Sequence, residues 1–510
     1  MKYGTILRNG VRPHARALSL VAAVLFVTSA AAAVVIIPNL FPYFDQTGLV
    51  STYNVGGPIV ENSPFFQSLG TNGRSCSTCH VIGNAMGISA QNAQERFVLT
   101  RGQDPLFAAV DGANCTSTSS NDPATHSLLL NNGVIRIPLQ LPVNAQFKIR
   151  AVVDPYGCGV VTDPVTNLQT VSVYRRPLPT TNLKFLSAVM FDGRETIVPL
   201  NDAKTFEANL MTDLMHQAMD ATTGHAQATE PPTPAQQQAI AEFELGLSSA
   251  QMLNKGGLLN EYGAQGGARN LAATNYYPGI NDALGADPTG AAFNPNAFTV
   301  FSAWEDLKAE NGRQQGMVEA QEDIAAGEKL FNSHPLTITS VRGLNDNAAL
   351  ATALGVPLPI ASFTGTCTTC HDTPNVGDHS VALPLDIGTG HDAAQEQDTQ
   401  IANGLAQLSF PRVPIYEITG CPNPFGAAGT SSEPYTIYTT DPGKALLTGQ
   451  CSDVNRIKGP ILRGLAARAP YFHNGAGKDL NEVVNFYNQR FQMNLTDKEK
   501  SQLVSFLNSL

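Results

Sequence analysis

Charged residues are scarce in this chain of 510 residues, and no short sequence repeat is present. Only 14% of the residues are charged, and 42 acidic against 31 basic residues give a formal net charge of −11. Nucleic-acid binding requires clustered Lys and Arg, so this balance argues against such a partner. A hydrophobic fraction of 43% argues against disorder, and the length allows two or three domains with substantial cores.

The N-terminus combines a basic start with an apolar run. Four basic side chains fall within the first 16 residues, and residues 17–37 are nearly uncharged. Small residues at 29–32 fit a signal-peptide cleavage site, but about 20 apolar residues would also span a bilayer. We therefore expect residues 1–45 to be a signal peptide or a membrane anchor. The rest would be periplasmic, either released or held at the inner membrane by residues 17–37, its only membrane contact.

Four of the eight cysteines belong to two Cys-x-x-Cys-His motifs, which are Cys76, Cys79 and His80, and Cys367, Cys370 and His371. In a c-type haem the two cysteines form thioether bonds to the vinyl groups, and the histidine is the proximal iron ligand. A zinc site would require a further Cys or His pair, and a thioredoxin-like pair does not require the histidine. The sequence therefore predicts two covalently bound haem c groups.

The other four cysteines are Cys115, Cys158, Cys421 and Cys451. In an oxidising compartment, four such cysteines indicate two disulfides. We expect the sequential pairing, Cys115 with Cys158 and Cys421 with Cys451, while two other connectivities remain open.

Few segments have the periodicity of a regular element, so long irregular loops are expected. An alternating pattern predicts a small β element within residues 135–174, and residues 255–300 resemble an extended insertion. Apolar periodicity predicts helices at residues 202–222, 235–251, 318–331, 480–489 and 496–507. Thr496 and Glu499 would form a capping box at the start of the last helix. We expect a mainly α chain with two haem-bearing units, residues 46–310 and 311–510.

Several segments around the two motifs carry a family resemblance. They are Phe191-Asp192-Gly193-Arg194-Glu195, His216-Gln217-Ala218, and residues 239–244, 459–466, 469–475 and 480–487. In sequence and order they resemble the bacterial di-haem cytochrome c peroxidase superfamily. The long insertions are more similar to its larger members, which are related to rubber-cleaving oxygenases and to di-haem enzymes that oxidise protein residues.

The resemblance implies two cytochrome c-like helical domains with different roles. The haem on His80 would react with peroxide or oxygen, and the haem on His371 would receive electrons. The family's C-terminal haem takes a second iron ligand from a Glu-x-Val-x-x-(Met or Tyr) helix. Tyr487 matches that position, Met493 is the less favoured candidate, and a tyrosine merely packed on the helix is the alternative.

The sequence also departs from the family pattern. The family's tryptophan before Asp-Gly-Arg is Phe191 here, and Trp304 is the only tryptophan. Arg96 stands where compact peroxidases have a displaceable histidine. No acid occurs at the place of the family's distal acidic residue, but His225 lies nearby. We expect His225 to be the distal acid–base, with a surface or structural histidine as the alternative.

Two arginines and one metal ion complete the expected sites. Arg194 and Arg463 could bind haem propionates through bidentate contacts, and buried salt bridges are an equal alternative. The family's interdomain calcium site uses an asparagine at a position taken here by Arg176. Backbone carbonyls near Pro470 remain, so calcium stays an open candidate.

Together these features predict a di-haem oxidoreductase that reduces hydrogen peroxide at the His80 haem. Electrons would pass through the His371 haem from a small donor protein, either a cytochrome or a cupredoxin. The first alternative is an oxygenase or oxidase acting on an organic or protein substrate, whose pocket the insertions would shape. The second is a non-catalytic periplasmic electron-transfer cytochrome.

Overall fold

The computed structural model describes residues 34–118, 121–307, 315–423, 425 and 434–510. It is 32% helical and 16% strand, with eleven α-helices and five small sheets in the described ranges. The chain is therefore a mixture of helices and strands, and the expectation of a mainly α chain with one small β element holds only in part.

The α-helices of the described ranges are α1 (Ala90–Thr100), α2 (Ser127–Asn132), α3 (Phe206–Gly224), α4 (Pro234–Leu245), α5 (Ala268–Ala272), α6 (Gln315–Ser333), α7 (Ala348–Leu354), α8 (Thr399–Leu405), α9 (Ala445–Thr448), α10 (Leu480–Arg490) and α11 (Asp497–Leu507). Each of the five helices that periodicity predicts overlaps an observed helix, namely α3, α4, α6, α10 or α11, whereas the other six helices of the described ranges were not predicted. The capping box of Thr496 and Glu499 is confirmed, because each side chain accepts a hydrogen bond from the other's backbone N–H.

One helix is shorter than predicted. Residues 235–251 were expected to be a single helix, but α4 ends at Leu245 and the chain continues as strand β9 (Leu247–Asn254). This strand pairs with β3 (Leu49–Asn54), and its Ser249 hydroxyl lies 2.8 Å from the hydroxyl of Thr52. A partner about 200 residues away therefore overrides the local helical pattern.

The strands form antiparallel sheets of two to four members. The four-stranded sheet has the order β10 (Gly257–Leu258), β9, β3, β2 (Tyr43–Phe44). The three-stranded sheets are β14 (Pro434–Thr439), β13 (Ile415–Pro422), β6 (Lys148–Val153), and β5 (Ile135–Gln140), β8 (Gln169–Arg175), β7 (Val160–Thr162). The two-stranded sheets are β1 (Ile36–Ile37) with β4 (Ile59–Val60), and β11 (Leu336–Ile338) with β12 (Phe363–Gly365).

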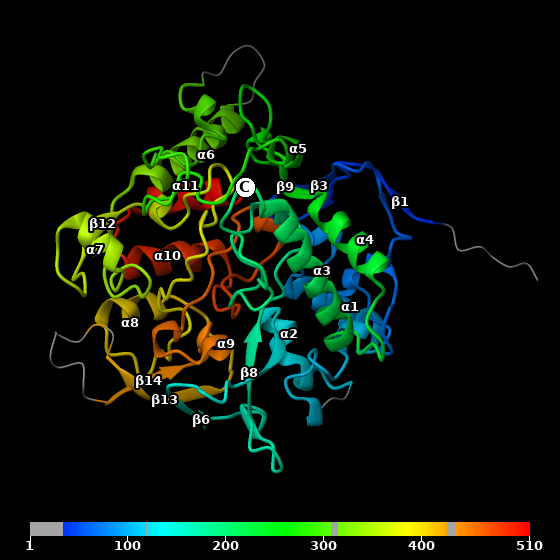
Figure 1. Ribbon diagram of the computed structural model, residues 1–510. Helices are drawn as coiled ribbons and strands as arrows, with labels where there is room; N and C mark the ends of the chain where they lie inside the picture. Colours follow the sequence, from blue (N-terminus) through cyan, green and yellow to red (C-terminus); the bar gives the residue numbers. More distant parts are fainter. Residues whose placement is uncertain (1–33, 119–120, 308–314, 424, 426–433) are drawn as a thin grey trace, which may run out of the picture.

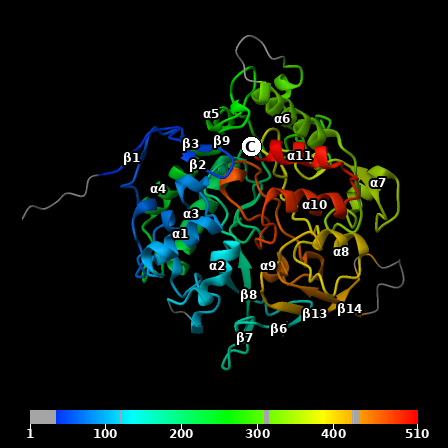
Figure 2. The ribbon, with the colours of Figure 1, turned by 180° about the vertical axis from the view of Figure 1, so that it is seen from behind.

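The two halves of the chain interleave. In Figure 1, α1, α3 and α4 lie on one side of the molecule, and α7, α8 and α10 lie on the other; Figure 2 shows the same division from behind. Strand β6 of the first half pairs with β13 of the second, and the Gln251 N–H donates to the Leu510 carbonyl. The insertion of residues 255–300 also packs against the second half, since Phe298 is buried in a core with Phe331 and Phe506.

A buried ion cluster joins distant segments near the centre. Arg175, at the end of β8, lies between Asp192 and Asp441, at 2.5 Å and 2.6 Å. All three side chains are almost fully buried. Burial opposes the charge on Arg175, but the two carboxylates raise its pKa above the ordinary value, so the cluster stays ionised.

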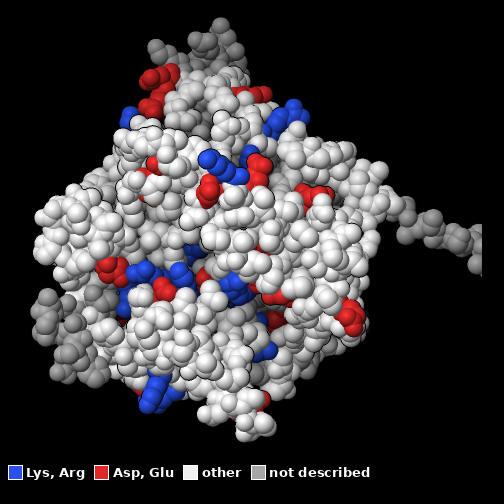
Figure 3. Space-filling model, viewed as in Figure 1, with Lys and Arg blue, Asp and Glu red and all other residues white. Residues whose placement is uncertain are grey.

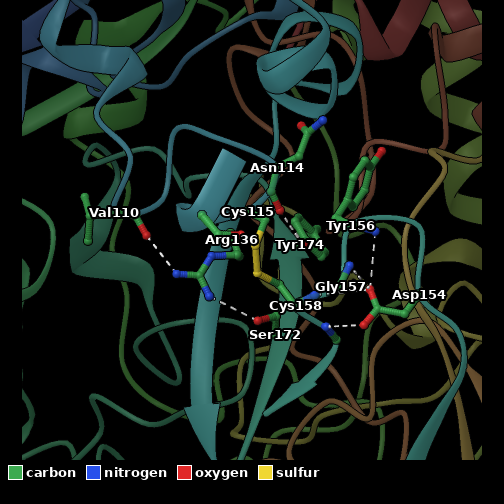
Figure 4. Close-up of a disulfide and its surroundings, with 12 residues drawn as sticks. Val110, Asn114, Cys115, Arg136, Asp154, Tyr156, Gly157, Cys158, Ser172 and Tyr174 are labelled. Carbon is green, nitrogen blue, oxygen red and sulfur yellow. Dashed lines mark hydrogen bonds between the residues drawn. A yellow bond between two sulfur atoms is a disulfide. The ribbon is translucent and has the colours of Figure 1, made fainter. Parts of the chain in front are cut away.

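Both expected disulfides are confirmed. Cys115 pairs with Cys158 and Cys421 pairs with Cys451, with Cα–Cα distances of 5.9 Å and 5.4 Å. Figure 4 shows the first bridge beside strand β8, where the Asp154 carboxylate accepts hydrogen bonds from backbone N–H groups next to Cys158. The bridges thus tie loops to the sheets that pack at the base of the molecule in Figure 1.

The expected signal or anchor lies mostly outside the described residues, which begin at residue 34. Only the end of the apolar run is described, and there Ile36 and Ile37 form strand β1. Over the described ranges, no helix is both long and apolar enough to cross a membrane.

Removal of a disulfide should lower stability without changing the fold. A Cys421→Ala/Cys451→Ala variant should lose about 2–5 kcal/mol of unfolding free energy, because the unfolded chain regains the entropy of an open loop. Denaturant unfolding followed by circular dichroism would measure the loss. Cys115→Ala/Cys158→Ala, which opens a separation of 43 rather than 30 residues, is the matched comparison. Unchanged unfolding midpoints in both variants would contradict the expectation.

Candidate functional site

The two Cys-x-x-Cys-His motifs fold in the same way. Each begins a short 3-10 turn, Cys76–Thr78 and Cys367–Thr369, closed by a capping box with the preceding Ser75 or Thr366. The backbone N–H of each histidine donates to the carbonyl of the first cysteine, at 3.0 Å in the first motif and 3.1 Å in the second. Cysteines and histidine therefore project from one rigid turn in both halves.

A backbone carbonyl six residues downstream orients each histidine. Nδ1 of His80 lies 3.2 Å from the Met86 carbonyl, and Nδ1 of His371 lies 2.6 Å from the Gly377 carbonyl. A histidine that donates its Nδ1–H in this way presents the Nε2 lone pair to a metal. Burial lowers the pKa of His80 to about 4 and also lowers that of His371, so both rings are neutral at neutral pH.

Each motif opens into a cavity. The cavity at His80 has a volume of about 170 Å³ and that at His371 about 230 Å³, and both are lined mainly by apolar side chains. The four motif cysteines line these cavities and are free thiols. Free thiols beside a neutral imidazole in an apolar cavity fit covalent attachment of haem. Among the described residues, two groups of side chains could hold a metal ion, and neither contains a motif residue.

His225 lies in the cavity of His80. It follows the last residue of α3, and its Nδ1 is hydrogen-bonded to the carboxylate of Asp111, which is also paired with Arg74. Burial raises the pKa of Asp111, but the hydrogen bond from His225 and the charge of Arg74 together bring it below the ordinary value. A carboxylate that holds Nδ1–H leaves Nε2 free to accept or donate a proton.

Sequence reasoning missed two carboxyl groups in this cavity. Asp111 is 114 residues from His225, and nothing in the sequence signals their contact. Glu244, on α4, is 2% exposed, and its Oε2 has no hydrogen-bond partner in the described part of the chain. Burial raises the pKa of Glu244 to about 8, so it is mostly protonated at neutral pH. Glu244 lies in the segment 239–244 that resembles the family, and this was the one feature of the sequence that could have pointed to it.

Tyr487 and Met493 both line the cavity of His371. Tyr487 projects from α10 and stacks on Phe491, with ring centroids 5.8 Å apart and planes at 21°. Its hydroxyl makes no hydrogen bond to any described residue, and burial raises its pKa, so the phenol is neutral in this structure. The sequence-predicted ligand candidates are thus brought together with His371.

The two arginine candidates differ in position. Arg194 lines the cavity of His80 and lies 3.1 Å from Asp192. Arg463 is buried and donates to the Asn375 carbonyl at 3.2 Å, but it is not among the residues that line either cavity. Arg96 likewise lines neither and forms an ion pair with Asp104.

Phe191 lines both cavities and lies in the wall between them. The residue at the position of the family's tryptophan thus contacts both cavities, although this residue is a phenylalanine here. At the position considered for calcium, the Arg176 guanidinium donates to the backbone carbonyls of Ile88 and Arg468. Calcium binding stays a prediction.

Part of the chain is similar to curated bacterial proteins. Cytochrome-c peroxidase IdrP2 of Denitromonas iodatirespirans is 29% identical over 175 residues, which are 32% of this chain and 41% of the relative. IdrP1 of the same organism is 25% identical over 206 residues, 38% of this chain and 50% of the relative. IdrP2 of Pseudomonas sp. (strain SCT) is 29% identical over 154 residues, 28% of this chain and 35% of the relative.

These matches span half or less of the length of the relatives. No family model matches the chain, and no solved structure matches it significantly. At this low identity, the relatives confirm the resemblance to cytochrome c peroxidases that the sequence motifs indicate.

Loss of a motif should remove one haem. We expect Cys76→Ala/Cys79→Ala and Cys367→Ala/Cys370→Ala each to reduce covalently bound haem from two per chain to one, because the thioether bonds cannot form. Intact mass and the pyridine haemochrome spectrum would measure this. Cys115→Ala/Cys158→Ala, which removes a disulfide instead, should keep both haems. Two haems in either motif variant would contradict the assignment.

Proposed function

We propose that this chain is a di-haem c-type peroxidase that reduces hydrogen peroxide in the cavity of His80, with electrons supplied through the cavity of His371. The observation that carries the proposal is the Asp111–His225 pair facing the cavity that contains Cys76 and His80. A haem attached there would supply the redox chemistry that breaks the oxygen–oxygen bond.

The protein's contribution in the first cavity is proton transfer. Breaking peroxide into water requires a proton to move from one oxygen to the other, and a histidine suits this task because its ordinary pKa is near neutral. Asp111 holds Nδ1 of His225, so Nε2 can take the proton and return it. Arg74 anchors Asp111 from the other side, which keeps the pair in one orientation.

The second cavity has a different set of groups. His371 and Tyr487 line it, and so does His379, whose Nδ1 lies 2.8 Å from the Asp372 carboxylate. A tyrosine ligand would fill the second axial position, which favours electron transfer over reaction with peroxide. Electrons would then cross the wall that contains Phe191.

The position of the insertion favours peroxide over a bulky organic substrate. No described residue of 255–300 lines either cavity. The insertion instead packs into the core around Phe331 and Phe506, so it does not shape the pocket that an oxygenase would need.

The donor in this proposal is a small cytochrome or cupredoxin in the periplasm. The two disulfides and the haem attachment sites support an oxidising compartment. On the face in Figure 3, acidic and basic side chains are interspersed on a largely uncharged surface. The net negative charge alone therefore does not locate a donor site.

Loss of the acid–base should abolish most peroxide turnover. We expect His225→Gln to lower kcat/KM for peroxide by about 10²–10⁴-fold, and Asp111→Asn by a smaller factor, because the imidazole is kept but loses its orientation. Peroxide-dependent oxidation of a reduced small cytochrome would measure both. Thr223→Ala is the control, because Thr223 lies on α3 two residues before His225 but does not line the cavity. Unchanged turnover in His225→Gln with both haems present would sink the proposal.

Tyr487 should set the spectrum of one haem only. We expect Tyr487→Phe to change the low-spin ferric signal of the resting protein by electron paramagnetic resonance and leave the high-spin signal of the His80 haem unchanged. Met493→Leu is the comparison that separates the two ligand candidates. Two low-spin haems in the unmodified protein would instead support a non-catalytic electron carrier.

A further inference from the structure

The wall between the two cavities is rich in cations. Arg176, Lys458 and Arg468 each line the cavity of His80 and the cavity of His371. Arg176 and Lys458 are 8% and 7% exposed, and Arg468 is half-buried. Three positive side chains are thus gathered where the two cavities adjoin.

None of the three cations has a carboxylate partner within ion-pair distance among the described residues. The Arg176 guanidinium donates to three backbone carbonyls, those of Ile88, Arg468 and Asn132. The Arg468 guanidinium donates likewise to three carbonyls, those of Gly464, Ile461 and Arg463. Carbonyls satisfy the N–H groups of these arginines but do not neutralise their charge.

Lys458 is the least satisfied of the three. Its backbone N–H donates to the Phe191 carbonyl at 2.8 Å, while its ammonium makes no hydrogen bond to any described residue. The charge of the buried Asp378 raises the pKa of Lys458, but Asp378 forms no ion pair with it, and neither carboxylate oxygen of Asp378 has a hydrogen-bond partner in the described ranges.

A buried charge without a counter-charge is costly, by several kcal/mol per ion. Burial accordingly lowers the pKa of Lys458 to about 8 and that of Arg176 to about 9. The wall therefore favours an anion that could enter from either cavity. Buried guanidinium and ammonium groups are suited to carboxylates, which accept charge-assisted hydrogen bonds.

We infer that Arg176, Lys458 and Arg468 form one carboxylate-binding cluster, shared by both cavities, that receives the propionate groups of both haems. The inference rests on the proposed function, since it requires a haem in each cavity. The cluster lies apart from the arginine pair indicated by the sequence: Arg194 lines the cavity of His80 and contacts Asp192, and Arg463 lines neither cavity.

The cluster would bind the carboxylates of each haem at the wall that contains Phe191, while the motif cysteines would hold each haem covalently. A shared cation also stabilises the extra negative charge of either reduced haem, so it would raise both reduction potentials.

Lys458→Met tests the inference on the haem-loaded protein, by titrating both haems spectroelectrochemically. We expect the equilibrium constant for reduction of both haems to fall about tenfold, which is about 59 mV for a one-electron couple. Lys458→Arg keeps the charge and should restore both potentials. Lys184→Met is the matched control, because Lys184 is half-buried, donates only to backbone carbonyls and lines neither cavity.

The outcomes separate this inference from the proposed function. If Lys458→Met shifts neither potential more than Lys184→Met does, the cluster does not bind the propionates. A shift of one haem alone would overturn a shared cluster. Two other results would count against the proposed function instead. One is that the unmodified protein binds fewer than two haems. The other is that it consumes no peroxide although Lys458→Met shifts both potentials.

Discussion

The buried ion cluster of Arg175, Asp192 and Asp441 determines how the two cavities meet. Two of its members are next in sequence to residues of the common wall: Arg176 follows Arg175, and Phe191 precedes Asp192. Removing one partner of such a cluster leaves an uncompensated buried charge, which typically costs about 3–5 kcal/mol. The wall is therefore held by ionic contacts between segments 266 residues apart, rather than by a continuous element.

The sequence predicted what is encoded locally. The capping box at Thr496 depends on residues close in the chain, and the disulfides depend on a small number of cysteines; the structure agrees with both predictions. The Asp111–His225 pair and the β6–β13 pairing depend on tertiary contacts that leave no local pattern. The end of α4 was missed for the same reason, because the pairing of β9 with β3 decides it.

The division into residues 46–310 and 311–510 stays a prediction. Trp304 lies before that boundary and Phe506 far beyond it, yet both are buried in one core. Strand β6 likewise belongs to the first half by sequence and pairs with β13 of the second. The composition of residues 255–300 indicated an irregular insertion. Composition cannot show that side chains of this segment are buried against a core formed by distant residues.

Identical attachment motifs do not make the two cavities equivalent. The same turn and the same downstream carbonyl present His80 and His371 as neutral ligands, so the attachment side of each site is alike. A carboxylate-held histidine lines each cavity, His225 in the first and His379 in the second, so the difference lies in Tyr487, which only the second cavity adds. Since a second iron ligand suits electron transfer and its absence suits reaction, the proposed division of labour rests on Tyr487 rather than on the motifs or on the acid–base histidines.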